Sequence, residues 1–561
     1  MNKQSQDFRN LNEKEVNQLK EQGCFASDWN SILISPDLNL ANIVNVFFKG
    51  MVTIYQGAVL RNIPGGIAGA VIRQNALVEN VASLEFEPDS RHGVGTMVSV
   101  LDETGSRAVP IYPGLSSQMA TLMARVPDWL TKIKDISLDI FLDSRVTPAE
   151  VGENAQVKNC GKIKNVSIGP EVIIDGASRL ENGSVINNAE PGKCFTFIGS
   201  AVEAENFILE DGRLESKSEV SDCYIGQGTV ISHGFNAHHS LFFANCTMDN
   251  GESHSLLAGP YTVSMHKGTL LIGCQTSFLN AGSLTNQSNH MYKLGPIHWG
   301  VMERGVKTSS GSYLMLGAKI GAFSLLMGSH KTHPDSSEFP FSHLYGEERG
   351  ATVIVPAVML RSCGLIRDEK KWHTRDKRAN KGLPLFDHIT LNVFNPYIID
   401  IMLKAIDIIN DELMKSEDYD RYMTYKGLKF TRASFERAKN LYTMAIFKYL
   451  SNVLPDLKFP ESDGLPAEEW IDLGGEIIPR SFISRVIDCD NIPEAETILS
   501  EAYANYKSLE MQWIGRRFGS WWRDRADQIK FYAHQFDEVI DEDRQQYLHT
   551  LSKETSMLSL L

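Results

Sequence analysis

The feature that most constrains the fold is an apolar residue that recurs every six positions. The anchors of this pattern are Ile72, Val78, Leu84, Val151, Val157, Ile163, Ile174, Leu180, Ile186, Ile225, Ile231, Ile272, Phe278 and Leu284. A small residue (Ala, Gly, Ser or Thr) stands four positions after 11 of these 14 anchors, although such residues make up only about a quarter of an average chain. Neither an alternating strand nor an α-helix repeats every six residues. The pattern predicts a β-helix in which three hexapeptides form one coil of roughly 18 residues.

Composition argues against a nucleic-acid partner and against a membrane span. The formal net charge of −14 disfavours general nucleic-acid binding, so no nucleic-acid partner is expected. No apolar run approaches the ~20 residues of a membrane span, and the first residues, MNKQSQDFRNLNEKE, are polar. The 8 cysteines form no CxxC pair. Reduced thiols in a cytoplasmic protein are therefore expected.

Changes of pattern along the chain divide it into five predicted segments. These are an N-terminal cap (1–40), the start of the β-helix (41–92), an inserted hairpin plus helix (93–148), the main β-helix (149–390) and an α-helical domain (391–561). The insertion is recognised by a hairpin pattern around Glu103 that is followed by helical spacing. The last segment carries apolar residues at helical spacing throughout.

The hexapeptide pattern resembles that of the left-handed β-helix, or hexapeptide-repeat, proteins, over residues ~40–90 and 150–390. The resemblance implies a mainly β fold with a long left-handed parallel β-helix. Most members of that superfamily are acyltransferases that use acyl-CoA, and they usually form homotrimers or other homo-oligomers with sites between subunits. The chain also resembles uncharacterised putative hexapeptide transferases of the Bacteroides group.

Histidines concentrate in one part of this β-helix, since ten of the 15 lie between His233 and His343. The stretch from Gly328 to Gly346 resembles the active-site loop of xenobiotic acetyltransferases, whose histidine takes the proton from an acceptor hydroxyl. By that resemblance His330 is the first candidate for the general base. His333 fits if one residue is deleted, and His290, in Asn-His-Met, resembles the first half of the motif alone.

Two further sets of residues complete the predicted transferase site. His298 and Asp335 are expected to orient the base or the acceptor, with Phe339 and Phe341 on the substrate side. A basic run is expected to meet the phosphates and adenine of the CoA co-substrate, unless it is simply a solvated linker. Its members are Lys370, Lys371, Trp372, Arg375 and Arg378.

The predicted function is acyl transfer from acyl-CoA to a hydroxyl or amine of a sugar or nucleotide-sugar. One alternative is zinc chemistry, because His233-x4-His238 resembles a histidine pair of the γ-class carbonic anhydrases, with His254, or else His239 or His266, as the third ligand. Three imidazoles and a water on zinc would generate hydroxide near neutral pH. The other alternative is a non-catalytic sugar-nucleotide-binding or scaffold protein.

Overall fold

The fold was obtained as a computed structural model that describes residues 8–288, 298–347, 351–417, 421–454, 456–522 and 525–558. The chain divides into two compact units. Unit 1 is Met1–Gly273 with Lys377–Asp387, and unit 2 is Cys274–Asp376 with His388–Leu561. Both contain parallel β-solenoid, about 17 turns in total. The structure therefore confirms the predicted mainly β fold with a long parallel solenoid, an inserted hairpin with helices and a C-terminal helical region.

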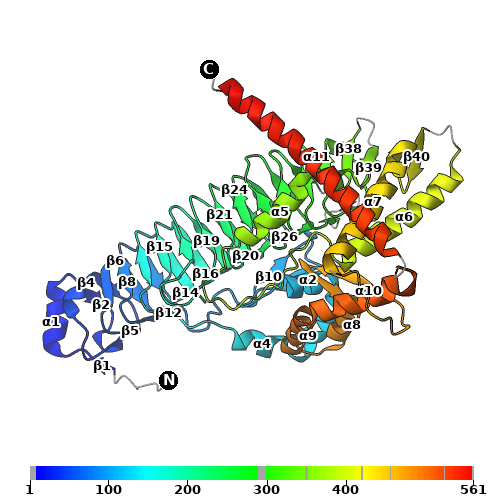
Figure 1. Cartoon of the computed structure of the whole chain (residues 1–561). Coiled ribbons are helices and arrows are strands. Elements are labelled where there is room, and N and C mark those ends of the chain that lie inside the picture. The colour runs from blue at the N-terminus through cyan, green and yellow to red at the C-terminus, as the bar shows by residue number, and fades with distance from the viewer. Residues whose placement is uncertain are drawn as a thin grey trace. The chain divides into compact units, whose positions relative to one another are not determined.

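Unit 1 consists of short solenoid strands with a few helices at its edges (Figure 1). Its helices are α1 (Glu13–Glu21), η1 (Trp29–Ser31), η2 (Leu40–Asn42), α2 (Ser117–Arg125), α3 (Pro127–Ile136) and α4 (Leu138–Ser144). Its strands are β1 (Arg9–Asn10), β2 (Phe25–Ala26), β3 (Ile32–Ile34), β4 (Ile43–Phe48), β5 (Val52–Ile54), β6 (Val59–Ala68), β7 (Ala70–Ile72), β8 (Leu77–Glu79), β9 (Ser83–Glu85), β10 (Met97–Ser99), β11 (Ala108–Pro110), β12 (Glu150–Val151), β13 (Gln156–Lys158), β14 (Lys162–Ile168), β15 (Ile173–Asp175), β16 (Arg179–Ile186), β17 (Phe197–Ile198), β18 (Glu203–Glu210), β19 (Arg213–Leu214), β20 (Glu219–Ile225), β21 (Val230–Ser232), β22 (Asn236–His238), β23 (Leu241–Phe242), β24 (Thr247–Asp249), β25 (Glu252–His254), β26 (Leu257–Ala258), β27 (Val263–Ser264) and β28 (Leu270–Ile272).

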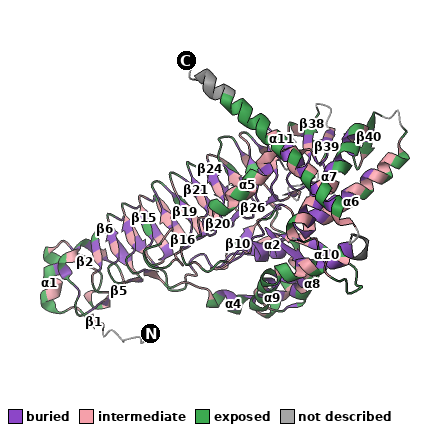
Figure 2. Cartoon of the chain, in the orientation of Figure 1, coloured by how far each residue is buried: buried purple, intermediate pink, exposed green. Residues whose placement is uncertain are grey.

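Ten of the twelve hexapeptide anchors of unit 1 are buried in the core of the solenoid, whereas Ile186 and Ile272 are only partly buried. Val78 pairs in parallel with Val157, and Val157 pairs with Ile174 seventeen residues further along the chain. All three side chains are fully buried. Figure 2 shows buried and partly buried residues along these strands. Because each coil lies about 4.8 Å from the next, the stacked anchors form one continuous apolar column, which is the driving force for repeat folding.

The predicted frame slips in the last run of anchors. Leu271 is fully buried in place of the expected anchor Ile272, which is only partly buried. The expected anchor Leu284 is 60% exposed and has the left-handed φ of 60° that is found at solenoid corners. The reason is that coil length varies. Ala237 pairs with Ser253 sixteen residues later, while Ser253 pairs with Leu271 eighteen residues later. A strict period of six therefore loses register with the inward-facing positions.

An asparagine ladder runs along one corner of unit 1. The amide of Asn45 donates to Asn62 (3.1 Å), Asn62 to Asn80 (2.9 Å), Asn80 to Asn159 (3.1 Å) and Asn159 to the carboxylate of Asp175 (2.9 Å). The four asparagines have φ between 53° and 55°. Asparagine tolerates this left-handed conformation better than other residues with a β-carbon, and its amide both donates and accepts. The ladder thus ties successive turns together outside the apolar core.

The ladder predicts different outcomes for two substitutions of Asn80. Asn80→Ala removes both amide hydrogen bonds and replaces asparagine by a residue that tolerates the left-handed φ of 55° less well, so we expect a loss of about 2–3 kcal/mol of stability. Asn80→Gly removes the same bonds without the conformational strain, and we expect a loss of about 1 kcal/mol. Denaturant unfolding of both variants checks this. Equal losses would show that strain at the corner contributes nothing.

A buried carboxylate network ties the inserted segment to the solenoid within unit 1. In the insertion, β10 pairs antiparallel with β11, and α2 follows. Asp387 accepts the backbone N–H groups of Ser117 (2.7 Å) and Ala244 (2.8 Å). Glu210 accepts the N–H of Gly114 (2.7 Å) and the hydroxyl of Tyr224 (2.9 Å). These carboxylates satisfy donors that would otherwise be buried without a partner.

Glu210 predicts a pH dependence of stability. Burial raises its pKa from the ordinary 4.5 to about 7. The folded state then retains a proton that the unfolded state releases, so the contribution of Glu210 to stability falls as pH rises from about 4.5 to about 7. Glutamine cannot ionise, so we expect the unfolding midpoint of Glu210→Gln to depend less on pH across this range than that of the wild type. If the midpoint of the variant falls with pH as steeply as that of the wild type, Glu210 is not the source of the pH dependence.

Unit 2 combines solenoid strands with the larger helices. Its strands are β29 (Cys274–Thr276), β30 (Asn280–Ala281), β31 (Asn286–Ser288), β32 (Gly300–Met302), β33 (Lys307–Thr308), β34 (Tyr313–Met315), β35 (Lys319–Ile320), β36 (Leu325–Met327), β37 (Ser329–His330), β38 (His343–Gly346), β39 (Thr352–Val355), β40 (Tyr422–Tyr425), β41 (Leu428–Thr431), β42 (Trp470–Leu473) and β43 (Glu476–Pro479). Its helices are η3 (Val358–Arg361), α5 (Cys363–Thr374), α6 (Pro396–Lys415), α7 (Arg432–Val453), α8 (Arg480–Asp488), α9 (Ile492–Ala504), α10 (Tyr506–Trp522) and α11 (Ala526–Leu558).

The helices of unit 2 pack on the end of its solenoid strands. Strand β39 turns back antiparallel to β38 and pairs in parallel with β41. An aromatic cluster fills the space behind this sheet, with the ring centroid of Phe339 5.2 Å from that of Phe430 and 6.0 Å from that of Phe435. Helix α7 contacts both α6 and α11. Among the described residues, no helix has the length and hydropathy that crossing a bilayer requires.

Candidate functional site

Three successive coils of unit 2 bring several of the predicted site residues onto one face. Val301 pairs with Lys319, and Lys319 forms a parallel bridge with Asp335. The N–H of Gly317 donates to the carbonyl of Trp299 (3.1 Å). We call this surface the His333 face and define it by the outward residues of the three coils. These are His298, Val301 and Glu303 on the first coil, Lys319 on the second, and His333 and Asp335 on the third.

His333 has the geometry of a general base. It lies at a solenoid corner with a φ of 49°, and its Nδ1 hydrogen-bonds the carbonyl oxygen of Leu316. Because a carbonyl oxygen can only accept, Nδ1 must carry the proton, and Nε2 is left with its lone pair. The ring is only partly buried. A fixed tautomer with an accessible Nε2 is what proton abstraction from a substrate hydroxyl requires.

His298 and Asp335 flank this base. The ring centroids of His298 and His333 lie 6.2 Å apart. Nε2 of His298 is buried and has no hydrogen-bond partner among the described residues, which leaves a polar atom available to a ligand or a water. Asp335 accepts the N–H (3.1 Å) and the hydroxyl (2.6 Å) of Ser337 and so shapes the loop that carries His333. The structure therefore brings three of the predicted residues together.

His330, the first candidate from the sequence, lies in a different environment. It is fully buried, with Nε2 3.1 Å from the carbonyl of Met327 and Nδ1 2.9 Å from the hydroxyl of Thr352. Both ring nitrogens are therefore used within the protein. Burial lowers the pKa of His330 to about 4. An enclosed imidazole that resists protonation is suited to holding β37 in place and not to exchanging protons with a substrate.

Of the remaining predicted residues, two are buried and one is not described by the structure. His290 lies outside the described residues. Phe339 and Phe341 are buried, since Phe339 packs in the aromatic cluster and Phe341 stacks on Phe323 with a centroid distance of 5.1 Å. Their apolar surface holds the helices of unit 2 on the solenoid. The physical reason is that large rings bury most favourably between two layers.

The basic run predicted to bind CoA belongs mostly to α5. Lys370 and Lys371 lie on this helix, and Arg375 follows it. Trp372 packs its ring against Phe278 at a centroid distance of 4.6 Å, so the indole already has a stacking partner. Arg378 is buried and belongs to unit 1. The first part of the run is therefore a helix that packs on the protein through Trp372, with Lys370 and Arg375 exposed. Arg378, which follows, is buried.

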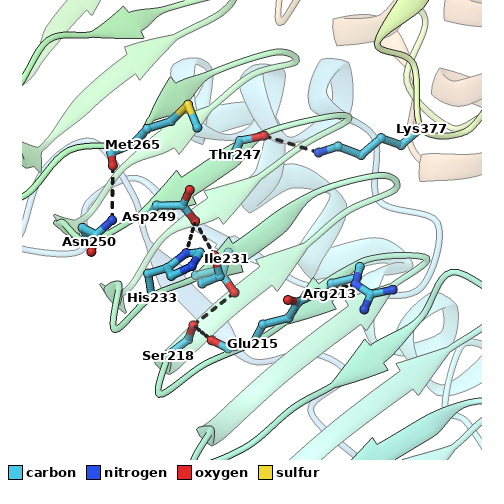
Figure 3. A network of polar contacts seen from close by, with 11 residues as sticks. Arg213, Glu215, Ser218, Ile231, His233, Thr247, Asp249, Asn250, Met265 and Lys377 are labelled. Carbon is cyan, nitrogen blue, oxygen red and sulfur yellow. Dashed lines mark hydrogen bonds and ion pairs between the residues drawn. The ribbon is translucent and has the colours of Figure 1, made fainter.

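The histidines of the zinc alternative occupy two places in unit 1. His233 lies at a corner, where its Nδ1 is 2.7 Å from the hydroxyl of Ser232 and 3.3 Å from the carboxylate of Asp249 (Figure 3). His238 and His254 are paired residues of β22 and β25, with ring centroids 6.2 Å apart. Within the described ranges, no three His, Cys, Asp or Glu side chains are arranged to hold a metal ion.

The other end of the His333 face carries residues that were not predicted from the sequence. Glu303 is four residues of extended chain, about 13 Å, beyond Trp299, and Tyr397 of α6 hydrogen-bonds its carboxylate. Burial raises the pKa of Glu303 to about 8. Next to it, the fully buried Arg304 lies 3.5 Å from Asp472 and donates to the carbonyl of Thr390. No motif marks these residues, because they meet only through the packing of the helices on the solenoid.

Comparison with known proteins adds a family but no chemistry. A family model described as "Domain of unknown function (DUF4954)" matches residues 8–72 and 52–413, which include the His333 face. An "Uncharacterized protein" of Treponema pallidum (strain Nichols) is 23% identical over 460 residues, or 73% of this chain and 62% of the relative. The chain thus spans less than two thirds of that relative's length.

Proposed function

The chain belongs to the family described as Domain of unknown function (DUF4954), and from the His333 face we propose that it transfers an acyl group from acyl-CoA to a hydroxyl or amine of a sugar-like acceptor. The observation that carries the proposal is the state of His333. Its Nδ1 is bonded to the Leu316 carbonyl, and its Nε2 has no hydrogen-bond partner among the described residues, so that it can accept a proton. The proposal includes a left-handed solenoid of the hexapeptide type and assembly as a homo-oligomer.

In the proposed reaction, Nε2 of His333 takes the proton from the acceptor as the acceptor oxygen or nitrogen attacks the thioester carbon. The new C–O or C–N bond forms, the C–S bond breaks, and the leaving CoA thiolate receives the proton from the imidazolium. The bond from Leu316 keeps the ring in one tautomer through both steps. In this proposal His298, whose Nε2 has no partner among the described residues, hydrogen-bonds the acceptor or orients it.

Charges along the face support a polyhydroxylated or amine acceptor. Asp335 supplies a carboxylate and Lys319 a cation, while Glu303, whose pKa burial raises to about 8, supplies a carboxyl group that is mainly protonated near neutral pH. Carboxylates are good acceptors for hydroxyl and ammonium donors. A nucleotide-sugar acceptor requires in addition cations that bind its phosphates, such as the exposed Lys370 of α5.

The test is turnover of acetyl-CoA by the purified full-length chain with neutral sugars, amino sugars and nucleotide-sugars, followed by mass spectrometry of the acceptor. We expect acetylation of at least one acceptor class. Calorimetry with CoA alone is the second measurement. Absence of CoA binding at millimolar concentration, together with absence of any acetylated product, would refute the proposal and favour the binding or scaffold alternative.

A further inference from the structure

A pocket of about 320 Å³ lies in unit 2, between η3 and α11. Its walls include Val358 and Arg361 on one side and Val539, Glu542 and Asp543 of α11 on the other. This volume is at the lower end of the range for small-molecule sites in proteins, about 300–1,000 Å³. None of the predicted transferase residues lines it, so it is a separate place on the molecule.

The charges of this pocket are not neutralised within the protein. Arg361 and Glu542 line the same cavity, yet no ion pair or hydrogen bond joins either side chain to another residue in the described part of the chain. Asp543 differs, because its carboxylate accepts the N–H of Cys363 (2.8 Å) at the start of α5. Among the described residues, the pocket therefore holds one cation and one anion without partners, and a second anion, Asp543, whose carboxylate is held by a backbone N–H.

The histidine of the pocket adds no charge near neutral pH. Nδ1 of His343 lies 3.2 Å from the hydroxyl of Tyr345, and Nε2 lies 3.1 Å from the sulfur of Met359. Burial lowers the pKa of His343, so the neutral ring is favoured. Met359, Val358 and Val539 supply apolar surface beside the charged groups.

We propose that this pocket binds a small zwitterion of the α-amino acid class. Arg361 would pair with the carboxylate through the planar fork that favours bidentate contact, Glu542 would pair with the ammonium, and the valines would contact a short aliphatic side chain. A phosphate group would bring a negative charge to Arg361 but no cation to pair with Glu542 and Asp543, and an uncharged apolar ligand would leave both Arg361 and Glu542 without partners. Opposite unpaired charges in one cavity thus favour a ligand that carries both.

The first experiment is isothermal titration calorimetry of the full-length chain with valine and two single-charge analogues. Isovalerate lacks the ammonium of valine, and isobutylamine lacks the carboxylate. We expect valine to bind and each analogue to bind at least about tenfold more weakly, since each lacks one charge-assisted contact. Inorganic phosphate is the fourth ligand and is expected not to bind. Equal binding of valine and either analogue, or binding of phosphate alone, would overturn the proposal.

The second experiment uses variants. Arg361→Gln and Glu542→Gln should each weaken valine binding at least about tenfold and leave the unfolding midpoint unchanged, because both side chains are exposed and neither has a partner in the described ranges. The matched control is Arg544→Gln on the same helix, since Arg544 pairs with Asp541 (3.0 Å) and does not line the pocket. Similar losses in all three variants, or no heat from wild type with any amino acid at millimolar concentration, would refute the site. Neither result bears on acyl transfer at His333.

Discussion

His333→Gln is expected to lower kcat for acyl transfer by about 10²–10⁴-fold, the usual contribution of a positioned general base. Glutamine can still donate a hydrogen bond to the Leu316 carbonyl, but it cannot accept a proton at neutral pH. Because His333 is only partly buried, the unfolding midpoint should stay near that of wild type. The measurement is the initial rate of acceptor acetylation at saturating acetyl-CoA, with the thermal midpoint recorded on the same preparation.

Two other histidines serve as controls for this prediction. His330→Gln removes a buried ring that contacts Met327 and Thr352, so we expect a lower midpoint but a near-normal kcat in the folded fraction. His373→Gln changes an exposed residue of α5 and should alter neither quantity. If His330→Gln abolishes turnover in a stably folded protein while His333→Gln does not, the base is His330 and not His333.

Arg304→Met is expected to cost about 3–5 kcal/mol of stability, as is typical when one partner of a buried ion pair is removed. The side chain of Arg304 is fully buried, and its guanidinium lies 3.5 Å from the carboxylate of Asp472 and 5.0 Å from the ring centroid of Phe278. Methionine fills much of the space but leaves Asp472 without its cation. Urea unfolding followed by tryptophan fluorescence measures the loss.

A second substitution separates the charge from the packing. In the double variant Arg304→Met with Asp472→Asn the uncompensated carboxylate is gone, and we expect recovery of a large part of the lost stability. The single variant Arg304→Lys should also be less stable than the wild type, because an ammonium cannot reproduce the planar contacts of the guanidinium to Asp472 and Thr390. A single variant Arg304→Met within about 1 kcal/mol of wild type would show that the pair contributes little, as most exposed pairs do.

The period of the sequence determined the solenoid and its core. Val78, Val157 and Ile174 recur because every coil must place an apolar residue in the same column, and this requirement is visible without any structure. The pattern failed at Leu284, because the core needs inward side chains but tolerates coils of different length. The asparagine ladder was also present in the sequence, as residues such as Asn62 and Asn80 one coil apart, but asparagines at a corner carry no hydrophobic signal.

Only the tertiary structure distinguished between histidines. His330 and His333 are three residues apart, and the sequence favoured the first by resemblance to a known loop. In the structure the chain turns at His333, so that one ring is enclosed with both nitrogens bonded and the other keeps Nε2 open. The pairing of Glu303 with Tyr397 and of Arg304 with Asp472 depends on how α6 and β42 pack on the solenoid. Such contacts join residues distant in the chain, and local periodicity contains no information about them.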